Sequence, residues 1–274
     1  MARILALSSH VAFGSVGLAA IVPALHWLGH EVIDMPTVLL SNHPGYPRFA
    51  GDPVLPGQIA AMVDALEANG WLADTAAVIT GYLPSPAHVT EARSALERVR
   101  RANPGALYLC DPVFGDEPDG LYLSEATAAA IRDELLPLAS LTTPNGFELS
   151  WLAGLPVGDA AEARQAAWAL GVPAVLATSV PASDNRLANV LVSSDESIAC
   201  YVSRRPSAPH GTGDLLAAMY LGRLLNGDAP AAALAAAASA VEASVAASHG
   251  RHELPLAAAG ALWANARPLP TAPV

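Results

Sequence analysis

Short apolar runs alternate with helix-like segments along most of the chain. The runs have the length and composition of buried strands, and they lie at 3–8, 31–40, 76–82, 106–113, 140–145 and 173–179. Apolar residues at helical spacing follow several of these runs, at 15–29, 59–68, 89–102 and 159–171. An alternation of strands and helices predicts a mostly parallel sheet with helices on both of its faces.

The third quarter of the chain has a different pattern. Three apolar runs follow one another at 173–179, 187–193 and 197–203, without room for a helix between them. This spacing predicts an antiparallel meander at one edge of the sheet. The chain then closes with three helices, the first of which is entered at Asp214. Since neither a repeat nor a long linker interrupts the pattern, we expect a single domain over residues 1–274, with a three-layer α/β/α fold and a mostly parallel central sheet with antiparallel edge strands.

The net charge of the chain excludes one class of partner. At pH 7 the 274 residues carry a formal charge of −11, whereas non-specific nucleic-acid binding needs a basic surface. The two cysteines, Cys110 and Cys200, have neither metal-ligand spacing nor the pattern of a disulfide framework. We therefore expect no nucleic-acid partner, reduced thiols and a cytoplasmic protein.

Two apolar segments are interpreted as parts of the fold. The N-terminal run is followed at once by Ser8, Ser9 and His10, which is typical of a first strand and not of a signal peptide. The alanine-rich segment 229–247 contains Glu242 and several serines, so that a helix of the fold explains it better than a membrane span. No membrane partner is expected.

The chain contains no lysine, and all its strongly basic side chains are arginines. A Walker-type phosphate lysine and a Schiff-base lysine are therefore absent. This excludes P-loop NTPases and pyridoxal-phosphate-dependent catalysts.

Polar motifs follow the predicted strands at the points where they end. They read SSH (8–10), SNHPGY (41–46), TGY (80–82), CDPVFGD (110–116), TPNGFE (143–148) and TS (178–179). In open α/β sheets, ligands bind beyond the carboxyl ends of the strands. We therefore expect these motifs to form one site.

A Gly-Thr-Gly turn, residues 211–213, leads directly into an apolar helix with Asp214 at its entry. The glycines permit positive φ and backbone N–H groups that point the same way, and the helix adds its positive end. Such a turn is predicted to bind an anion, phosphate above all. Asp214 is then either a helix cap or a base beside the phosphate. A cap alone does not explain the two glycines, which favours the base.

Oxygen ligands are concentrated in two of the motifs. Asp111 and Asp116 are hard donors that suit Mg²⁺, although aspartate is also a common turn former. Thr143 and Asn145 precede Glu148, and the spacing of Asn145 and Glu148 is also that of a helix capping box. Asn145 and Glu148 are predicted to complete a metal–water network with the two aspartates near nucleotide phosphates.

Taken together, the motifs resemble those of pyridoxal kinases, the vitamin B6 kinases of the ribokinase superfamily. LSSHVAFGSVG, SNHPGY, TGY, CDPVFGD, TPNGFE, TS and GTGD occur in the family's order, from about residue 3 to beyond residue 225. The resemblance implies a ribokinase-like fold and ATP-dependent phosphorylation of the 5′-hydroxymethyl group of pyridoxal, with pyridoxine and pyridoxamine as further acceptors, in vitamin B6 salvage. It also implies Mg²⁺ with ATP, and a homodimer formed through the face that carries the edge strands.

The resemblance also assigns roles to individual residues. Asp214 matches the catalytic base, and the backbone of Gly211, Thr212 and Gly213 matches the anion hole for the transferred phosphoryl group. The residues that match positions around ATP are Asp111, Thr143, Asn145, Glu148, Thr178 and Ser179, with Asp111, Asp116 and Glu148 as metal ligands. The residues that match the pocket of the pyridine ring are Ser9, Val16, His43, Pro44, Gly45 and Tyr82.

Three departures from the family pattern bear on the substrate. Pro44 stands where threonine is usual, which removes a hydroxyl and a backbone donor, and Ser15 stands where tyrosine is common. The family's phosphate-side lysine is absent, so that charge neutralisation would rest on metal, backbone and Arg204 or Arg205. Two alternatives stay open, a hydroxymethylpyrimidine kinase of the same superfamily and a non-catalytic protein that binds pyridoxal or pyridoxal phosphate. The need for a monovalent cation, K⁺ or Na⁺, is also open, and segment 204–211 is the candidate for a mobile flap.

Overall fold

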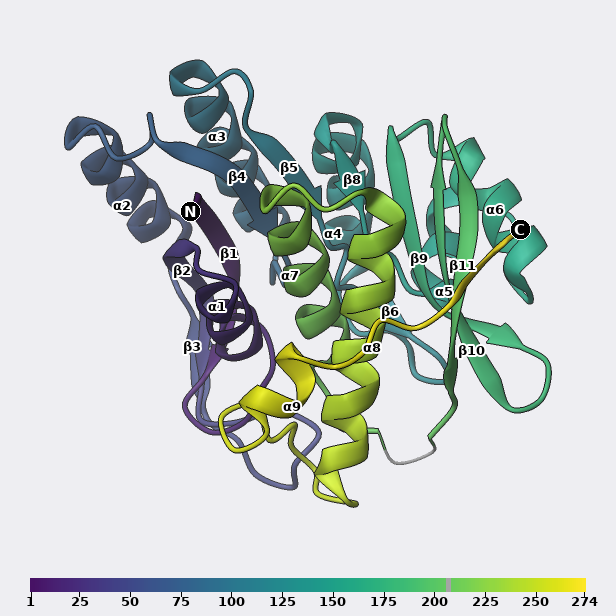
Figure 1. Cartoon of the computed structure of the whole chain (residues 1–274). Coiled ribbons are helices and arrows are strands. Elements are labelled where there is room, and N and C mark those ends of the chain that lie inside the picture. Colours follow the sequence, from purple (N-terminus) through teal and green to yellow (C-terminus); the bar gives the residue numbers. More distant parts are fainter. Residues whose placement is uncertain (206–207) are drawn as a thin grey trace.

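The computed structural model describes residues 1–205 and 208–274, and a ten-stranded sheet runs through its centre (Figure 1). In spatial order the strands are β12 (Thr271–Pro273), β11 (Ser197–Ser203), β10 (Arg186–Ser193), β9 (Ala174–Ala182), β8 (Leu141–Thr142), β5 (Leu107–Cys110), β4 (Thr75–Thr80), β1 (Arg3–Val11), β2 (Glu31–Leu40) and β3 (Gly51–Pro53). The strands from β9 to β2 pair in parallel. Their carboxyl ends therefore lie at the same end of the sheet.

Helices cover both faces of the sheet, as the alternating pattern predicts (Figure 1). One layer consists of α1 (Leu18–Trp27), α7 (Thr212–Leu225), α8 (Pro230–Ser248) and α9 (Gly260–Ala264). The other consists of α2 (Pro56–Ala68), α3 (Pro86–Ala102), α4 (Glu125–Ala130), a π-helical turn η1 (Ile131–Leu135), a 3₁₀ turn η2 (Leu136–Leu138), α5 (Gly146–Ala153) and α6 (Ala160–Ala169). Successive residues of a strand point to opposite faces, so that Ile4 packs in the first layer and Leu5 in the second. The three-layer α/β/α fold is confirmed.

Antiparallel strands lie at both edges of the sheet and not at one. The predicted meander of β9, β10 and β11 is confirmed. At the other edge, β3 pairs antiparallel with the end of β2. The chain also ends with a strand and not with the last helix, since β12 follows α9 and pairs with β11. Both β3 and β12 have 3 residues, which is too short for an apolar alternation to mark them in the sequence.

Helix α8 is the one helix of the described ranges that is long and apolar enough to cross a membrane by length and composition. In its most apolar window, 56% of the residues are buried inside the fold. Leu234 and Ala237 of α8 pack in the same core cluster as Leu215 and Tyr220 of α7. The contacts of α8 are those of a core helix, as the sequence predicts.

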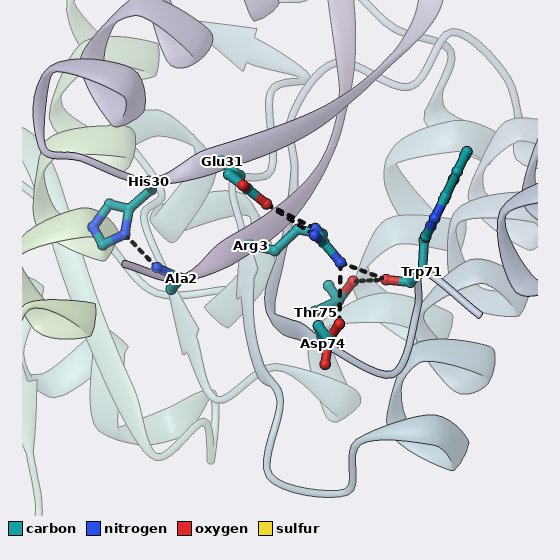
Figure 2. Close-up of polar contacts among 7 residues, drawn as sticks. All are labelled: Ala2, Arg3, His30, Glu31, Trp71, Asp74 and Thr75. Carbon is teal, nitrogen blue, oxygen red and sulfur yellow. Dashed lines mark hydrogen bonds and ion pairs between the residues drawn. The ribbon is translucent and has the colours of Figure 1, made fainter. Parts of the chain in front are cut away.

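A polar network joins the amino ends of β1, β2 and β4 (Figure 2). Arg3 donates through Nε and Nη2 to Glu31 Oε2, at 3.1 and 2.9 Å, and its Nη1 lies 3.4 Å from Asp74 Oδ2. Beside it, Ala2 N donates to His30 Nδ1 at 3.3 Å. Exposed ion pairs of this kind contribute about 0–1 kcal/mol to stability.

Candidate active site

The carboxyl ends of the parallel strands bring the predicted motifs to one end of the sheet. Four motifs lie in the turns after β2, β4, β5 and β8, and the N-terminus of α7 enters from one helix layer. The other two do not follow a strand as predicted: residues 8–10 lie inside β1, and residues 178–179 lie in the middle of β9. We call the turns after β1, β2 and β4 the acceptor side, and those beside β5, β8 and β9 the nucleotide side. Asp214 contacts the acceptor side, and Thr212 and Gly213 line a cavity on the nucleotide side.

The 211–214 turn is built against the turn after β1. Gly211 caps α7 with φ of 90°, and a Cβ on it would run into the carbonyl oxygen of Ser15. Gly17 N donates to Asp214 Oδ2 at 2.9 Å. Gly17 has φ of 56°, and a Cβ there would run into Ser9. Both positions require glycine, and together they fix the Asp214 carboxylate at the end of the first strand.

Asp214 lies in the first turn of α7 and is partly buried. Burial raises the pKa of Asp214 to about 6, and the hydrogen bond from Gly17 N opposes part of this rise. The carboxylate is therefore mostly ionised at neutral pH. Its Oδ1 accepts no hydrogen bond from the described residues, whereas Oδ2 is held by Gly17. A carboxylate with one free oxygen can accept the proton of an alcohol.

Asp111 follows β5 directly and is 7% exposed. Thr143 Oγ1 donates to Asp111 Oδ1 at 2.7 Å, which brings two predicted nucleotide-side residues into contact. Burial, followed by the charge of Asp214, raises the pKa of Asp111 to about 7, and the hydrogen bond from Thr143 limits the rise. The charge of Asp214 therefore acts on Asp111, in agreement with the prediction that both acids belong to one site.

Asn145 and Glu148 form a capping box at the start of α5. Glu148 N donates to Asn145 Oδ1, and Asn145 N donates to Glu148 Oε2, both at 2.9 Å. Glu148 Oε1 accepts from Phe114 N at 3.0 Å, and Asn145 Nδ2 donates to Gly115 O at 2.8 Å. Capping is thus confirmed, and the pair also fixes the loop after β5. Burial and then the charge of Asp111 raise the pKa of Glu148 well above its ordinary value.

The acids Asp111, Glu148 and Asp214 share the site without a basic partner. They take part in none of the ion pairs found among residues 1–205 and 208–274. A divalent cation that prefers oxygen ligands would neutralise this charge, and the donor set fits Mg²⁺. In the described part of the chain, no group of three or more His, Cys, Asp or Glu residues is arranged to hold a metal alone.

Asp116 lies apart from these acids, on a hairpin formed by β6 (Gly115–Asp116) and β7 (Gly120–Leu121). Its side chain is exposed and accepts from the N–H of the next residue at 2.8 Å. Its role as a metal ligand stays a prediction. Tyr122, directly after the hairpin, was not predicted from the sequence. Burial raises the pKa of its phenol, and it is raised further by the charges of Glu148, Asp111, Asp214 and Asp116.

A cavity of about 100 Å³ opens on the nucleotide side, between β9–β11 and helices α7 and α8. The predicted residues Thr178, Ser179, Thr212 and Gly213 line it. Arg205, a candidate for charge neutralisation, and Ala208 of the predicted flap line it as well. The remaining wall residues were not predicted from the sequence, and they are Leu187, Asn189, Val202, Ser203, Leu216, Ala238, Val241, Glu242 and Val245. In the sequence these are ordinary strand and helix residues without a local motif. Apolar walls with a few polar groups fit a flat base with polar edges.

On the acceptor side, buried hydroxyls hold the backbone of Tyr82. Ser8 Oγ accepts from Tyr82 N at 3.1 Å, and Thr37 Oγ1 donates to Tyr82 O at 2.6 Å. Ser8 and Thr37 are fully buried. The sequence had drawn attention to Ser9, the neighbour of Ser8, and to Val16, which is 8% exposed in the turn after β1.

His43 stacks on His210, with ring centroids 4.0 Å apart and 21° between the planes. His43 Nδ1 accepts from Gly45 N at 3.0 Å, and Pro44 between them is exposed. The stack joins the predicted acceptor loop to the residue that precedes the predicted anion hole. Burial, and then the neighbouring His210, lowers the pKa of His43. Of the predicted flap, Pro206 and Ser207 lie outside the described residues.

Gly17 and His210 are functional candidates that sequence reasoning passed over although the sequence carries a signal for each. Gly17 lies between the end of the first strand and the first helix, in the same position as Gly211 before α7. His210 directly precedes the glycine turn. For Tyr122 and the cavity wall, the sequence carries no such signal.

Known proteins match this chain over most of its length. The model of the family described as phosphomethylpyrimidine kinase matches residues 58–256. The pyridoxal kinase PdxY of Deinococcus radiodurans is 37% identical over 271 residues, which cover 94% of this chain and 91% of that protein. The pyridoxal kinase of Arabidopsis thaliana is 35% identical, over 80% of this chain and 73% of that protein.

Solved structures have the same fold. The pyridoxal kinase of Entamoeba histolytica superposes with a TM-score of 0.94 and 26% identity over 100% of both chains. That of Leishmania donovani, in complex with ADP and pyridoxine, has a TM-score of 0.91 and 29% identity over 99% of each chain. The fold and the family implied by the sequence motifs are both confirmed. The chain belongs to the pyridoxal kinase family and has its ribokinase-like fold.

Proposed function

We propose that the protein transfers the γ-phosphoryl group of ATP to the 5′-hydroxymethyl group of pyridoxal, giving pyridoxal 5′-phosphate, and that pyridoxine and pyridoxamine are further acceptors. The observation that carries the proposal is the contact of Gly17 N with Asp214 Oδ2 at 2.9 Å. It holds a carboxylate at the N-terminus of α7, with the acceptor-side turns on one side and the nucleotide-side cavity on the other. Leishmania donovani relatives were solved with ADP and pyridoxine or pyridoxamine.

Asp214 is the base of the proposed reaction. Phosphoryl transfer depends mainly on alignment and on stabilising spread negative charge. The free oxygen of Asp214 accepts the hydrogen bond of the acceptor hydroxyl, and it takes the proton as the new P–O bond forms and the bond to ADP breaks. The N–H groups of Gly211, Thr212 and Gly213 receive oxygens of the transferred group at the positive end of α7.

Asp111 and Glu148 are the residues that would hold Mg²⁺, with Asp116 as a further ligand from the hairpin. When bound with ATP, the ion supplies neutralisation of the phosphate charge. Thr143 and Asn145 keep the two buried acids in their orientations through the hydrogen bonds at 2.7 and 2.9 Å. Thr178 and Ser179 lie beside the bound nucleotide in the cavity they line. Since the chain has no lysine, Arg204 or Arg205 supplies the remaining positive charge, and Arg205 lines the cavity.

The proposed ring pocket consists of Ser9, Val16, His43 and Tyr82, with Pro44 and Gly45 at its rim. Val16 offers an apolar surface, and the rings of His43 and Tyr82 can pack against a flat heteroaromatic ring. The stack of His43 on His210 supports this placement, because it brings the ring pocket to the phosphoryl turn.

Hydroxymethylpyrimidine is the second candidate acceptor, because the matching family model is described as phosphomethylpyrimidine kinase. It is also a flat ring with a hydroxymethyl group, and it would use the same base. A non-catalytic role in binding pyridoxal or pyridoxal phosphate has less support. A carrier has no need of a partly buried carboxylate such as Asp214, whose pKa is raised to about 6.

We further propose that one domain over residues 1–274 carries the activity, in the cytoplasm and as a homodimer through the face with the edge strands. Reduced thiols support the cytoplasmic location, since Cys110 and Cys200 are free and buried. Two exposed apolar side chains lie at the β3 edge, where Leu39 and Phe49 are 49% and 53% exposed, whereas the edge strands of the prediction are those of the meander at the other edge.

The experiment is ATP-dependent phosphorylation by the purified protein with Mg²⁺, in parallel with K⁺ and with Na⁺. Pyridoxal, pyridoxine, pyridoxamine and hydroxymethylpyrimidine are offered side by side, with Asp214→Ala as the control. We expect turnover of pyridoxal that disappears in the variant. A preference for hydroxymethylpyrimidine would change the identity of the acceptor but keep the proposed mechanism. Binding of pyridoxal without any turnover would overturn the kinase and favour the carrier.

A further inference from the structure

One carboxylate from the C-terminal part of the chain contacts both acceptor-side loops. Glu253 lies between α8 and α9, and its Oε2 accepts from Ser15 N at 3.0 Å. Its Oε1 accepts from Tyr46 Oη at 2.8 Å. The next residue adds a bond, because Ser15 Oγ donates to Leu254 O at 2.8 Å. The turn after β1 and the loop after β2 are thus tied to the same segment.

The turn after β1 is shaped to receive this carboxylate. Gly14 has φ of 118°, and a Cβ on it would lie 2.7 Å from Glu253 Oε2. Any other residue there would be strained and would displace the carboxylate. On the other loop, the ring of Tyr46 makes an edge contact with His252, with centroids 6.0 Å apart.

Glu253 extends from a rigid part of the core. Leu254 and Leu256 are 2% and 6% exposed and pack in the cluster that includes α7 and α8. Trp263 of α9 donates through Nε1 to Leu256 O at 2.9 Å. The backbone on the C-terminal side of Glu253 is therefore fixed, and its carboxylate holds the two loops at a set distance from the core.

Both loops carry residues of the proposed site. In the turn after β1, Glu253 holds the N–H of Ser15, and Asp214 holds the N–H of Gly17, with Val16 between them. The loop after β2 contains His43 close to Tyr46. This loop lacks one backbone donor of its own, because Pro44 has no N–H.

We propose that Glu253 is a positioning residue for the phosphoryl acceptor. It fixes the turn that holds the base and the loop that borders the ring, and it touches no reacting atom. The kinetic consequence rests on the proposed function, whereas the ordering of the loops does not. Charged hydrogen bonds to both loops make the effect specific to the acceptor, since the nucleotide-side cavity has none of these residues in its wall.

The test compares Glu253→Ala, Glu253→Gln and Tyr46→Phe with Glu125→Ala, a matched removal of an exposed glutamate in α4. Loss of charged hydrogen bonds predicts a KM for pyridoxal about tenfold higher or more in Glu253→Ala, and about threefold higher in Tyr46→Phe. Glutamine keeps one acceptor, so that Glu253→Gln falls between wild type and alanine. The KM for ATP stays within about twofold in all of them. Equal rises in both KM values, or none, would overturn the positioning role.

Hydrogen exchange separates this inference from the proposed function. In Glu253→Ala, amides of residues 12–17 and 41–46 are expected to exchange faster, while those of β5 and β9 keep the wild-type rate. A uniform increase across the chain would show a general loss of stability and would overturn the inference, as would unchanged exchange in both loops. If the wild type phosphorylates no acceptor, the proposed function fails, and the exchange data alone decide whether Glu253 orders the loops.

Discussion

The two ends of the central strands carry acids in opposite circumstances. At the amino end, Glu31 and Asp74 are 51% and 80% exposed and share Arg3 (Figure 2). At the carboxyl end, Asp111 and Glu148 are 7% and 3% exposed, and hydroxyl and backbone N–H groups hold them instead of an arginine. The negative charges of the acids at the amino end are balanced by an arginine of the protein. Those of the acids at the carboxyl end have no basic partner among the described residues.

This difference separates an amino end whose charged groups add a little stability from a carboxyl end whose buried acids are suited to binding ligands. An exposed ion pair is screened by water and contributes about 0–1 kcal/mol. Buried acids without a cation disfavour their own charged forms, as the raised pKa values of Asp111, about 7, and Asp214, about 6, show. Such a cluster lowers the stability of the ligand-free protein, and a metal ion bound with phosphate would neutralise its charge. Functional sites are where this arrangement is expected.

Among substitutions at the two ends of the sheet, removal of the proposed base is expected to have the largest effect on catalysis. Asp214→Asn keeps the shape of the side chain but cannot take the proton of the acceptor. A positioned base contributes about 10²–10⁴-fold, so kcat is expected to fall by that factor, with little change in the KM for ATP. The measurement is steady-state phosphorylation of pyridoxal.

The matched control is Asp74→Asn at the amino end, which removes an aspartate charge of the balanced group. Its kcat is expected to equal that of the wild type. A near-normal kcat in Asp214→Asn would remove this residue from the base role.

An intermediate effect is expected for Asp111→Asn. The folded pKa of Asp111, about 7, lies above its ordinary value of 3.8. Its stability contribution is therefore fully present below pH 3.8 and is lost as the pH rises through about 7. Without ligands, the variant should melt above the wild type by roughly 5 °C at pH 8, and by less at pH 5. With Mg²⁺ and ATP it should lose activity, with a KM for ATP about 10–100-fold higher.

Thermal unfolding at the two pH values, with and without Mg²⁺ and ATP, checks this expectation. A Tm difference that is the same at pH 5 and pH 8 would show that Asp111 carries no unfavourable charge in the folded protein.

The smallest effect is expected at the amino end. Arg3→Ala removes the contacts with Glu31 and Asp74. Since these pairs are exposed, the loss in unfolding free energy should stay below about 1 kcal/mol, with unchanged kcat. Chemical denaturation and the same kinase assay measure both quantities. A loss of activity without a loss of stability would show that the polar network at the amino end influences the site at the carboxyl end, which contradicts the separation of the two ends.

The sequence predicted most of the fold because periodicity and strand-end motifs are local signals. It placed the parallel strands, the meander and the glycine turn before α7. The hydrogen bond from Thr143 to Asp111 was not predicted and comes from the structure. It missed β3 and β12, because strands of 3 residues carry too few positions for a pattern. Asn145 and Glu148 show the limit of a motif: their spacing predicted both a capping box and a metal network, and hydrogen bonds established the first.

The sequence by itself determined the layers, the end of the sheet that carries the site and the residue types available there. These follow from hydrophobic periodicity and from glycine and aspartate at short spacing. Only the tertiary structure decided that Gly17 holds Asp214, 197 positions away, and that Glu253 holds Ser15, 238 positions away. The physical reason is that such contacts depend on how strand ends and helix ends meet across the layers. No local pattern encodes that meeting, and so the orientation of the base and the position of the acceptor loops appear only in the folded chain.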